Sequence, residues 1–326
     1  MSEQKLLARG RRSLFKNQWF FLLIAEIVLA VITGIVNPRF FSVSNLMNIL
    51  EQIAVLGIVS SGMTMLIITG EIDISVGANI GITACVMAML MNASLPGGYF
   101  IPLLVGVAVA VLNSFMVGIT SIAFKAPSFI TSLAFISVFK GIALALTRGS
   151  MQTIYGKFET LGLTRLGGVL PLSFLLGLGA YFLVFFILNF AKFGRRIYSV
   201  GSNPNAAYLS GISVNKTKII TFILNGLFLG FAAMILLSKI GAAQPSTASG
   251  IELKAIGAVV IGGTPLSGGK GRIIGTFFGV LLMGIISNSL NMLRVNPYYQ
   301  EVTFGVLIIA SLALSVLSNY KKKTSV

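Results

Sequence analysis

Two glycine-bounded segments contain most of the residues in this chain whose types and spacing could do chemistry. One of them, GGTPLSGGKGRIIG at 262–275, looks at first sight like a phosphate-binding loop. That loop needs a glycine, four residues, and then Gly-Lys followed by Ser or Thr, whose hydroxyl binds Mg²⁺. Here Lys270 is followed by Gly271, and Thr264 stands where the first glycine is needed. We therefore expect no nucleotide to bind at this segment.

The same segment is better interpreted as a break in a membrane helix. Proline lacks a backbone N–H donor, and glycines permit a sharp turn. Non-helical backbone at membrane depth persists only where protein buries it or water reaches it, and broken helices often mark a translocation path. We predict a structural or gating turn formed by Gly262, Gly263, Pro265, Gly268 and Gly269.

The second segment, GEIDISVG at 70–77, places two carboxylates between apolar runs. Carboxylates close to hydrocarbon need water or a partner. In one interpretation the segment is a tight turn with solvated acids. In the other it is a structural clamp, in which Glu71 or Asp73 caps the following helix or pairs with a cytoplasmic Arg. The residues of this second predicted turn are Gly70, Glu71, Asp73, Ser75 and Gly77.

Few residues are suited to catalysis or to metal binding. The chain contains no His, the commonest general base and metal ligand. Its one Cys, Cys85, lies in an apolar run and has no partner for an internal disulfide. We expect no catalytic residue, no metal site and no cofactor bound by this chain, so an intramembrane enzyme is poorly supported.

A few polar residues lie inside apolar runs, and they have two possible roles. Asparagines between helices can form interhelical hydrogen bonds, worth about 0.6 kcal/mol on average in a bilayer. They can also line a polar path, where a hydroxyl-rich solute would need donors and acceptors. The asparagines in question are Asn113, Asn225, Asn288 and Asn291, and Glu26 and Lys140 are ionisable residues away from the span ends.

The elements that position these residues are membrane helices. Of the 326 residues, 56% are hydrophobic and 10% are charged, and the mean hydropathy is +0.94. A soluble domain has about 25% charged residues. We predict an all-α polytopic membrane protein, a single transmembrane domain over 1–326, with broken or re-entrant segments. The ten predicted spans are 18–36, 50–69, 77–93, 100–123, 128–147, 169–190, 219–239, 253–265, 273–292 and 299–318.

The positive charge is distributed as membrane topology requires. With the N-terminus inside, 16 of the 24 Lys and Arg residues fall on inner segments, 7 on outer segments or outer span ends and 1 in the interior of a span. This bias follows the positive-inside rule. It explains the net charge of +16 without a nucleic acid partner. We predict cytoplasmic basic tails at 1–17 and 319–326, and a cytoplasmic loop at 191–218.

That loop contains the longest polar segment, FGRRIYSVGSNPNAAYLSGISVNKTKI at 193–219. Asn203 and Pro204 predict the start of a helix, because Asn caps well and Pro is tolerated in the first turn. The pattern predicts a short helix over 205–210, and Gly211 predicts its end. Such a helix could act as a lever against a soluble partner, or it could be a plain loop helix.

The chain resembles the permease subunits of bacterial ATP-binding-cassette importers of the ribose type. The resemblance covers nearly the whole chain and rests on the order and spacing of several blocks. These are GEIDISVG (70–77), KAPSFITSLAF (125–135), the 193–219 segment, AQPSTASGIELKAIGAVVIGGTPLSGGKGRIIGT (243–276) and NSLNMLRVNPYYQ (288–300).

The resemblance implies a set of partners. In such importers two permease subunits, identical or similar, form the path in the bacterial inner membrane. Two cytoplasmic ATPases, which bind ATP and Mg²⁺, dock beneath them, and a periplasmic or lipid-anchored binding protein delivers the solute. The resemblance thus implies that this chain is a transport subunit, with ATP hydrolysis on a partner chain.

The resemblance also implies roles for residues in the cytoplasmic loop. The family's coupling motif, Glu-Ala-Ala-x-x-x-Gly, is matched by Ala206, Ala207 and Gly211, and Asn205 stands where the family usually has Glu. Gly201 and Asn203 match the pattern before the motif. In the 70–77 block, Asp73, Ser75 and Gly77 match, whereas Glu71 replaces a residue that is often Gly.

The implied solute is a monosaccharide or a related polyol, such as a ribose-like pentose or a hexose. A nucleoside or branched-chain amino acid permease of the wider superfamily remains an alternative. From a different class, an ion-coupled secondary transporter would need intramembrane acids as proton sites. Glu26 is the one acid in a predicted span that offers itself for that role.

Overall fold

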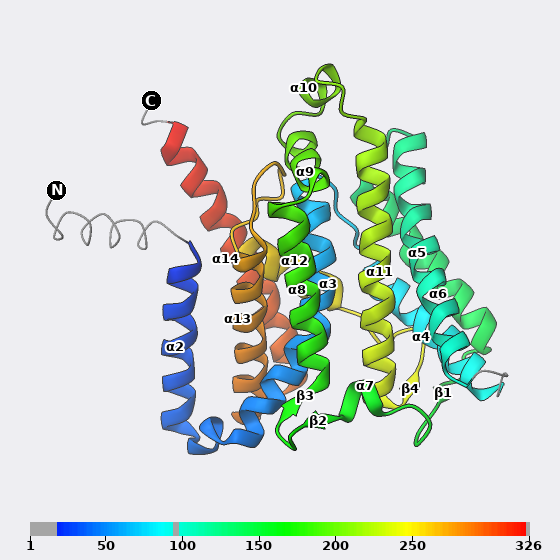
Figure 1. The fold of residues 1–326 in the computed structure, drawn as a ribbon. Helices are drawn as coiled ribbons and strands as arrows, with labels where there is room; N and C mark the ends of the chain where they lie inside the picture. Colours follow the sequence, from blue (N-terminus) through cyan, green and yellow to red (C-terminus); the bar gives the residue numbers. More distant parts are fainter. Residues whose placement is uncertain (1–17, 94–97, 324–326) are drawn as a thin grey trace, which may run out of the picture.

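The computed structural model describes residues 18–93 and 98–323, and these form an assembly of helices with four two-residue strands (Figure 1). The predicted basic tail at 1–17 and residues 324–326 of the predicted C-terminal tail lie outside the described residues. In chain order the elements are α2 (Gln18–Val36), η1 (Pro38–Phe41), α3 (Val43–Ile68), α4 (Val76–Asn92), α5 (Phe100–Ala123), α6 (Ser128–Thr147), β1 (Gln152–Thr153), α7 (Thr160–Leu163), β2 (Arg165–Leu166), β3 (Leu170–Pro171), α8 (Leu172–Asn189), α9 (Lys192–Ser202), α10 (Pro204–Leu209), α11 (Val214–Ile240), β4 (Ala242–Ala243), α12 (Ile251–Ile261), α13 (Ile273–Met292) and α14 (Pro297–Lys323).

Each of the ten predicted spans contains a helix, and six of those helices are long and apolar enough to cross a membrane. These six are α3, α5, α6, α8, α11 and α13. α2 and α4 are shorter apolar helices. α12 has 11 residues, and at about 1.5 Å per residue it is too short to cross alone. The chain is a polytopic all-α membrane protein.

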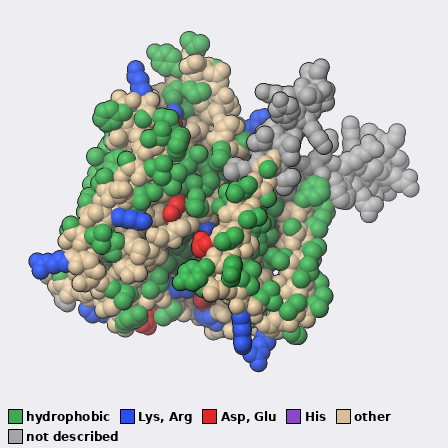
Figure 2. Space-filling model, turned by 180° about the vertical axis from the view of Figure 1, so that it is seen from behind, with side chains coloured by type: hydrophobic (Ala, Val, Ile, Leu, Met, Phe, Trp, Pro, Cys, Tyr) green, Lys and Arg blue, Asp and Glu red, His purple; other side chains and the backbone are tan. Residues whose placement is uncertain are grey.

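The helices form a buried centre with an apolar periphery. The most apolar stretch of α3 is 83% buried, whereas those of α5, α6 and α8 are 28%, 22% and 28% buried. Helices that are apolar yet unburied face lipid or another apolar surface. On the face that Figure 2 shows, hydrophobic side chains cover wide zones and charged side chains are few.

Small residues allow the central helices to pack closely. Gly226 and Gly230 of α11 lie directly against α5, where a Cβ on Gly226 would come within 2.6 Å of the Val111 Cα. A Cβ on Gly230 would come within 2.9 Å of the Val107 Cα. This close backbone approach is how membrane helices associate when there is no hydrophobic force between them.

The two ends of the helix assembly differ in structure (Figure 1). α9, α10 and the turn between α12 and α13 lie at one end, which we call the α10 end. α7 and the short strand pairs lie at the other, which we call the α7 end. α2 begins and α14 ends toward the α10 end.

The helix breaks are stabilised by contacts from distant parts of the chain. Between α3 and α4 the backbone is neither helix nor strand, and the N–H groups of Ile72 and Ile74 donate to the hydroxyls of Ser128 and Ser132 at 2.9 and 3.0 Å. These serines are one turn apart on α6, so they lie on one face of that helix. The α6 serines therefore satisfy backbone donors that a helix would otherwise pair.

A second break precedes α12. The chain turns back from β4 through residues 244–250 and packs against α4, where two glycines leave room for it. A Cβ on Gly81 would come within 2.6 Å of the Pro245 carbonyl oxygen, and one on Gly77 within 2.6 Å of the Ala248 carbonyl oxygen. Gly77 is therefore required for close packing of the re-entrant segment.

Candidate functional site

The short helix predicted in the polar loop is present as α10, and its ends are formed as predicted. The Asn203 side chain accepts a hydrogen bond from the Ala206 N–H at 3.0 Å, and Pro204 is the first helical residue. Gly211 follows the helix with φ +78°. The N–H of Ile212 bonds to the Ala207 carbonyl at 3.0 Å, which completes the turn that commonly ends a helix with glycine.

α10 projects from the molecule at the α10 end (Figure 1). Ala207 faces inward and is buried, whereas Asn205 and Ala206 are exposed. Tyr208 and Leu209 are 72% and 85% exposed. The two alanines of the motif thus face opposite ways, and the outward surface combines an alanine, an asparagine and a large apolar tip.

α9 connects this surface to the predicted turn at 262–275. The Tyr198 hydroxyl donates to the Gly271 carbonyl at 2.8 Å, and the Ser202 hydroxyl donates to the Gly269 carbonyl at 3.2 Å. Burial raises the pKa of the Tyr198 hydroxyl, and the nearby Arg272 guanidinium opposes part of that rise. The hydroxyl therefore remains protonated at neutral pH and can keep donating.

The same turn is joined to the end of α3. The Gly269 N–H donates to the Ile68 carbonyl at 2.8 Å. Gly201 of α9 fits into this junction with no space for a side chain, because a Cβ there would overlap the Ile68 carbonyl oxygen and the Gly269 nitrogen. Thus α9, the 262–275 turn and the end of α3 form one contiguous backbone contact.

The glycines of the 262–275 turn have two separate functions in the structure. Gly268 and Gly269 adopt φ +76° and +72°, which L side chains rarely adopt. Gly262 lies directly against the backbone of Gly275, which brings α12 and α13 together. The turn is closed locally by a hydrogen bond from the Gly268 N–H to the Pro265 carbonyl at 3.1 Å. Gly263, with φ +94°, precedes it.

The acids of the 70–77 turn are buried, so the interpretation with solvated acids is wrong. Glu71 is 6% exposed and Asp73 is 0% exposed. Glu71 forms an ion pair with Lys218 of α11, a Lys where the clamp interpretation expected an Arg. Sequence reasoning missed this pairing because the two residues are far apart in the chain. Gly70, with φ +83°, allows the turn before Glu71.

Asp73 does not cap α4 in the expected way. Ser75 occupies the N-cap position and makes no side-chain capping bond. Asp73 instead accepts from the Ser75 N–H at 2.9 Å and from the Ser75 hydroxyl. Its second oxygen accepts from the Asn225 side chain at 3.4 Å. The carboxylate therefore holds the segment between α3 and α4 in place from within the protein.

The four asparagines predicted as candidates for a path each hydrogen-bond within the chain. Asn225 contacts Asp73, and Asn113 donates to Asn79 at 2.9 Å. Asn288 exchanges two bonds of 2.9 Å with Asn45. Asn291 accepts from the Gln300 amide at 2.9 Å. Asn225 and Asn288 are buried. These contacts are interhelical or local, and lining of a path by these residues stays a prediction.

The structure thus gathers the residues predicted for coupling and both glycine turns at one end, and it adds residues that sequence reasoning missed. Five such residues form a hydrogen bond or an ion pair with one of the predicted turns: Tyr198, Ser202, Ser128, Ser132 and Lys218. The paired serines of KAPSFITSLAF were visible as hydroxyls at helical spacing, but nothing in the sequence indicated an unpaired backbone opposite them.

Comparison with known proteins identifies relatives over nearly the whole chain. The ribose import permease of Escherichia coli (strain K12) is 37% identical, over 96% of this chain and 98% of that protein. The ribose import permease of Bacillus subtilis (strain 168) is 37% identical, over 88% and 89%. The D-allose transport system permease of Escherichia coli (strain K12) is 32% identical, over 94% and 93%.

No solved structure matches the chain. A family model described as "Branched-chain amino acid transport system / permease component" matches residues 45–312. The relatives confirm the resemblance to ribose-type permeases that the motifs indicated, and the chain belongs to this family of transport-system permease components.

Proposed function

We propose that this chain is the membrane-spanning subunit of an ATP-driven importer and forms the path for a monosaccharide. Three of its relatives are named as permeases for ribose, D-allose and xylose. The observation that carries the proposal is the contact of α9 with the 262–275 turn and with the end of α3. It links an exposed helix, suited to dock a partner, to the breaks in the central helices.

The proposed partners follow from this assignment. A cytoplasmic ATPase, which binds ATP and Mg²⁺, docks on Ala206, Tyr208 and Leu209 of α10. A solute-binding protein, periplasmic or lipid-anchored, docks at the α7 end. A second copy of this chain, or a similar permease, completes the path. Because Asn205 stands where the family usually has Glu, this docking surface has no carboxylate at that position.

In the proposed topology the chain spans the inner membrane of a bacterial cell, and its α10 end faces the cytoplasm. Residues 241–250 and α12 together form one crossing, because β4 and the turns after it lead the chain back from the α7 end and α12 continues it as a helix. With that crossing counted, the chain passes the membrane ten times and both ends lie in the cytoplasm. The positive charge on the loops of the α10 end agrees with this orientation.

The proposed mechanism uses the backbone junction as a lever. When the ATPases close, α10 moves with them, and α9 transmits the movement to the turn at 262–275 and to the end of α3. The permease then alternates between two states whose relative free energies the ATPase changes. Breaks in α3–α4 and α12–α13 are the positions where the backbone can adjust without breaking helical hydrogen bonds.

The test is uptake by proteoliposomes that contain this chain with its ATPase and binding protein. D-ribose, D-allose and D-xylose are the probes, and L-leucine tests the branched-chain amino acid alternative. We expect sugar uptake that stops when ATP is depleted while the proton gradient is preserved. Uptake that follows the proton gradient would instead support ion coupling, for which Glu26 is the candidate because its buried carboxylate has no hydrogen-bond partner among the described residues.

A further inference from the structure

A cavity of about 380 Å³ lies between α3, α11, α12, α13 and α14, away from the α10 junction. Its walls include Glu51 of α3, Lys239 at the end of α11 and Thr247 in the re-entrant segment before α12. These residues place it toward the α7 end (Figure 1). Val55 and Met283 contribute apolar wall. A cavity with an apolar wall and a few polar groups is the usual form of a small-molecule site.

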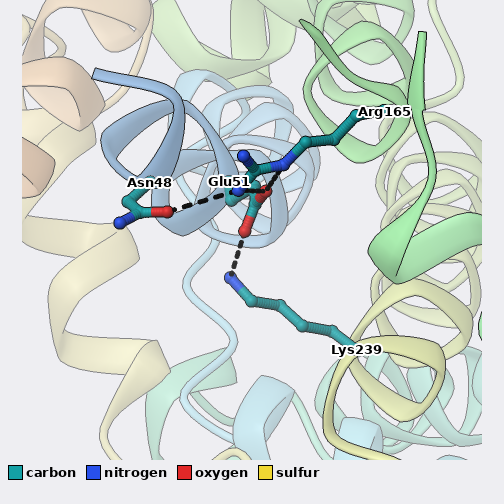
Figure 3. Close-up of polar contacts among 4 residues, drawn as sticks. All are labelled: Asn48, Glu51, Arg165 and Lys239. Atoms are coloured by element: carbon teal, nitrogen blue, oxygen red, sulfur yellow. Dashed lines mark hydrogen bonds and ion pairs between the residues drawn. The ribbon is translucent and has the colours of Figure 1, made fainter. Parts of the chain in front are cut away.

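The charged groups of this cavity already have partners. Both oxygens of Glu51 are engaged, one by Arg165 at 2.8 Å and the other by Lys239 at 3.9 Å (Figure 3). Lys254 pairs with Glu301 at 2.9 Å. A charged ligand would have to displace one of these ion pairs, so the cavity favours a neutral ligand over an anion or a cation.

The uncharged polar groups are free to bind. Gln52 and Ser287 line the cavity, and within the described part of the chain their side chains form no hydrogen bond. The Thr247 hydroxyl accepts from the Gln244 N–H at 2.8 Å and still has its own proton to donate. An amide and two hydroxyls beside an apolar wall match a solute that has many hydroxyls on a carbon frame.

We propose that this cavity is a binding site on the transport path for a neutral polyhydroxylated solute, and that Gln52, Ser287 and Thr247 hydrogen-bond to this solute. The ion pairs of Glu51 and Lys254 fix the helices around it. This inference rests on the proposed function, since the solute class is the same. It adds the residues that contact the solute and the end of the molecule from which the solute enters.

The direct test is protection from thiol labelling. A Gln52→Cys variant is expressed in membranes and treated with a small membrane-impermeant thiol reagent added from the α7 side. The native Cys85 is 0% exposed, so it contributes no background. Gln152→Cys, at the same end but outside the cavity, is the matched control. We expect labelling at both positions, and slowing by D-ribose, D-allose or D-xylose at position 52 alone.

Failure to label Gln52→Cys would overturn the inference, because the cavity would be closed to that side. Labelling that these sugars do not slow, or that L-leucine slows instead, would also overturn it.

A transport measurement separates this inference from the proposed function. The Gln52→Leu/Ser287→Ala double variant is compared with a Gln152→Leu/Ser150→Ala control in proteoliposomes with the partner subunits. Each hydrogen bond lost to a neutral group weakens binding by about fivefold. We expect sugar uptake to fall at least about tenfold at low sugar concentration. Uptake equal to the control overturns the inference alone, whereas absence of uptake by the wild type overturns the proposed function and the inference with it.

Discussion

The carbonyl of Ile68, the last residue of α3, accepts a hydrogen bond from the N–H of Gly269 at 2.8 Å. This bond joins the two helix breaks, which are far apart in the sequence. Gly201 of α9 lies against both partners of the bond. A displacement of α9 therefore changes the contact between the breaks directly, and this is the physical basis of the coupling that we propose between α10 and the membrane helices.

Replacing Gly201 by Ala tests the closeness of this junction. The added Cβ would overlap backbone atoms, which cannot move aside as a flexible side chain can. We expect destabilisation of about 1–3 kcal/mol, measured as a lower midpoint of thermal unfolding in detergent. Gly141→Ala on α6 is the control, because a Cβ there meets nothing within 4 Å. Equal midpoints for the two variants would show that the junction is looser than described.

Replacing Tyr198 by Phe removes the hydrogen bond to Gly271 and preserves the ring. We expect a loss of about 0.5–1.5 kcal/mol in stability and less sugar transported for each ATP hydrolysed. Tyr155→Phe is the control, since the Tyr155 side chain is exposed at the α7 end. A Tyr198→Phe complex with wild-type transport for each ATP hydrolysed would remove this contact from the coupling route.

The Tyr198 hydroxyl also predicts how the stability of the protein depends on pH. Because the folded-state pKa of Tyr198 is raised, its contribution to stability is fully present below the ordinary tyrosine pKa, which is about 10. It is lost as the pH rises through the raised value. The difference in unfolding midpoint between wild type and Tyr198→Phe should therefore stay constant from about pH 6 to 9. A difference that shrinks within this interval would contradict a protonated donor.

The ion pair between Glu71 and Lys218 predicts a large effect from a single substitution. Glu71→Gln leaves a largely buried ammonium without its partner, and breaking a buried pair costs about 3–5 kcal/mol. Glu301→Gln is the matched control, because its pair is exposed, with the Glu301 side chain 64% exposed, and such pairs contribute about 0–1 kcal/mol. Denaturation in mixed micelles measures both. A small loss of stability on Glu71→Gln would contradict this, because it would show that water solvates the Lys218 ammonium in the folded protein.

Much of this architecture could be predicted from the sequence, for local reasons. Asn203, Pro204 and Gly211 are a helix start and stop whose chemistry depends on adjacent residues, and α10 has the predicted ends. Burial of Glu71 and the non-helical backbone at 72–74 depend on Lys218 and on the α6 serines, which only the tertiary fold brings near. The position of the short helix α12 likewise depends on Gly77 and Gly81 of α4, which leave room for the re-entrant segment before it.

The coupling role of α10 is the central claim, and ATP-driven sugar uptake by the Gly211→Pro variant in proteoliposomes tests it most directly. Gly211 has φ +78°, which proline cannot adopt, so the end of α10 must rearrange. Gly168→Pro, at a position with φ +74° in the β2–β3 turn of the α7 end, is the control. We expect Gly211→Pro to lose uptake, or to hydrolyse ATP without uptake, while Gly168→Pro retains coupling. Equal uptake for each ATP hydrolysed by Gly211→Pro and wild type would contradict the account.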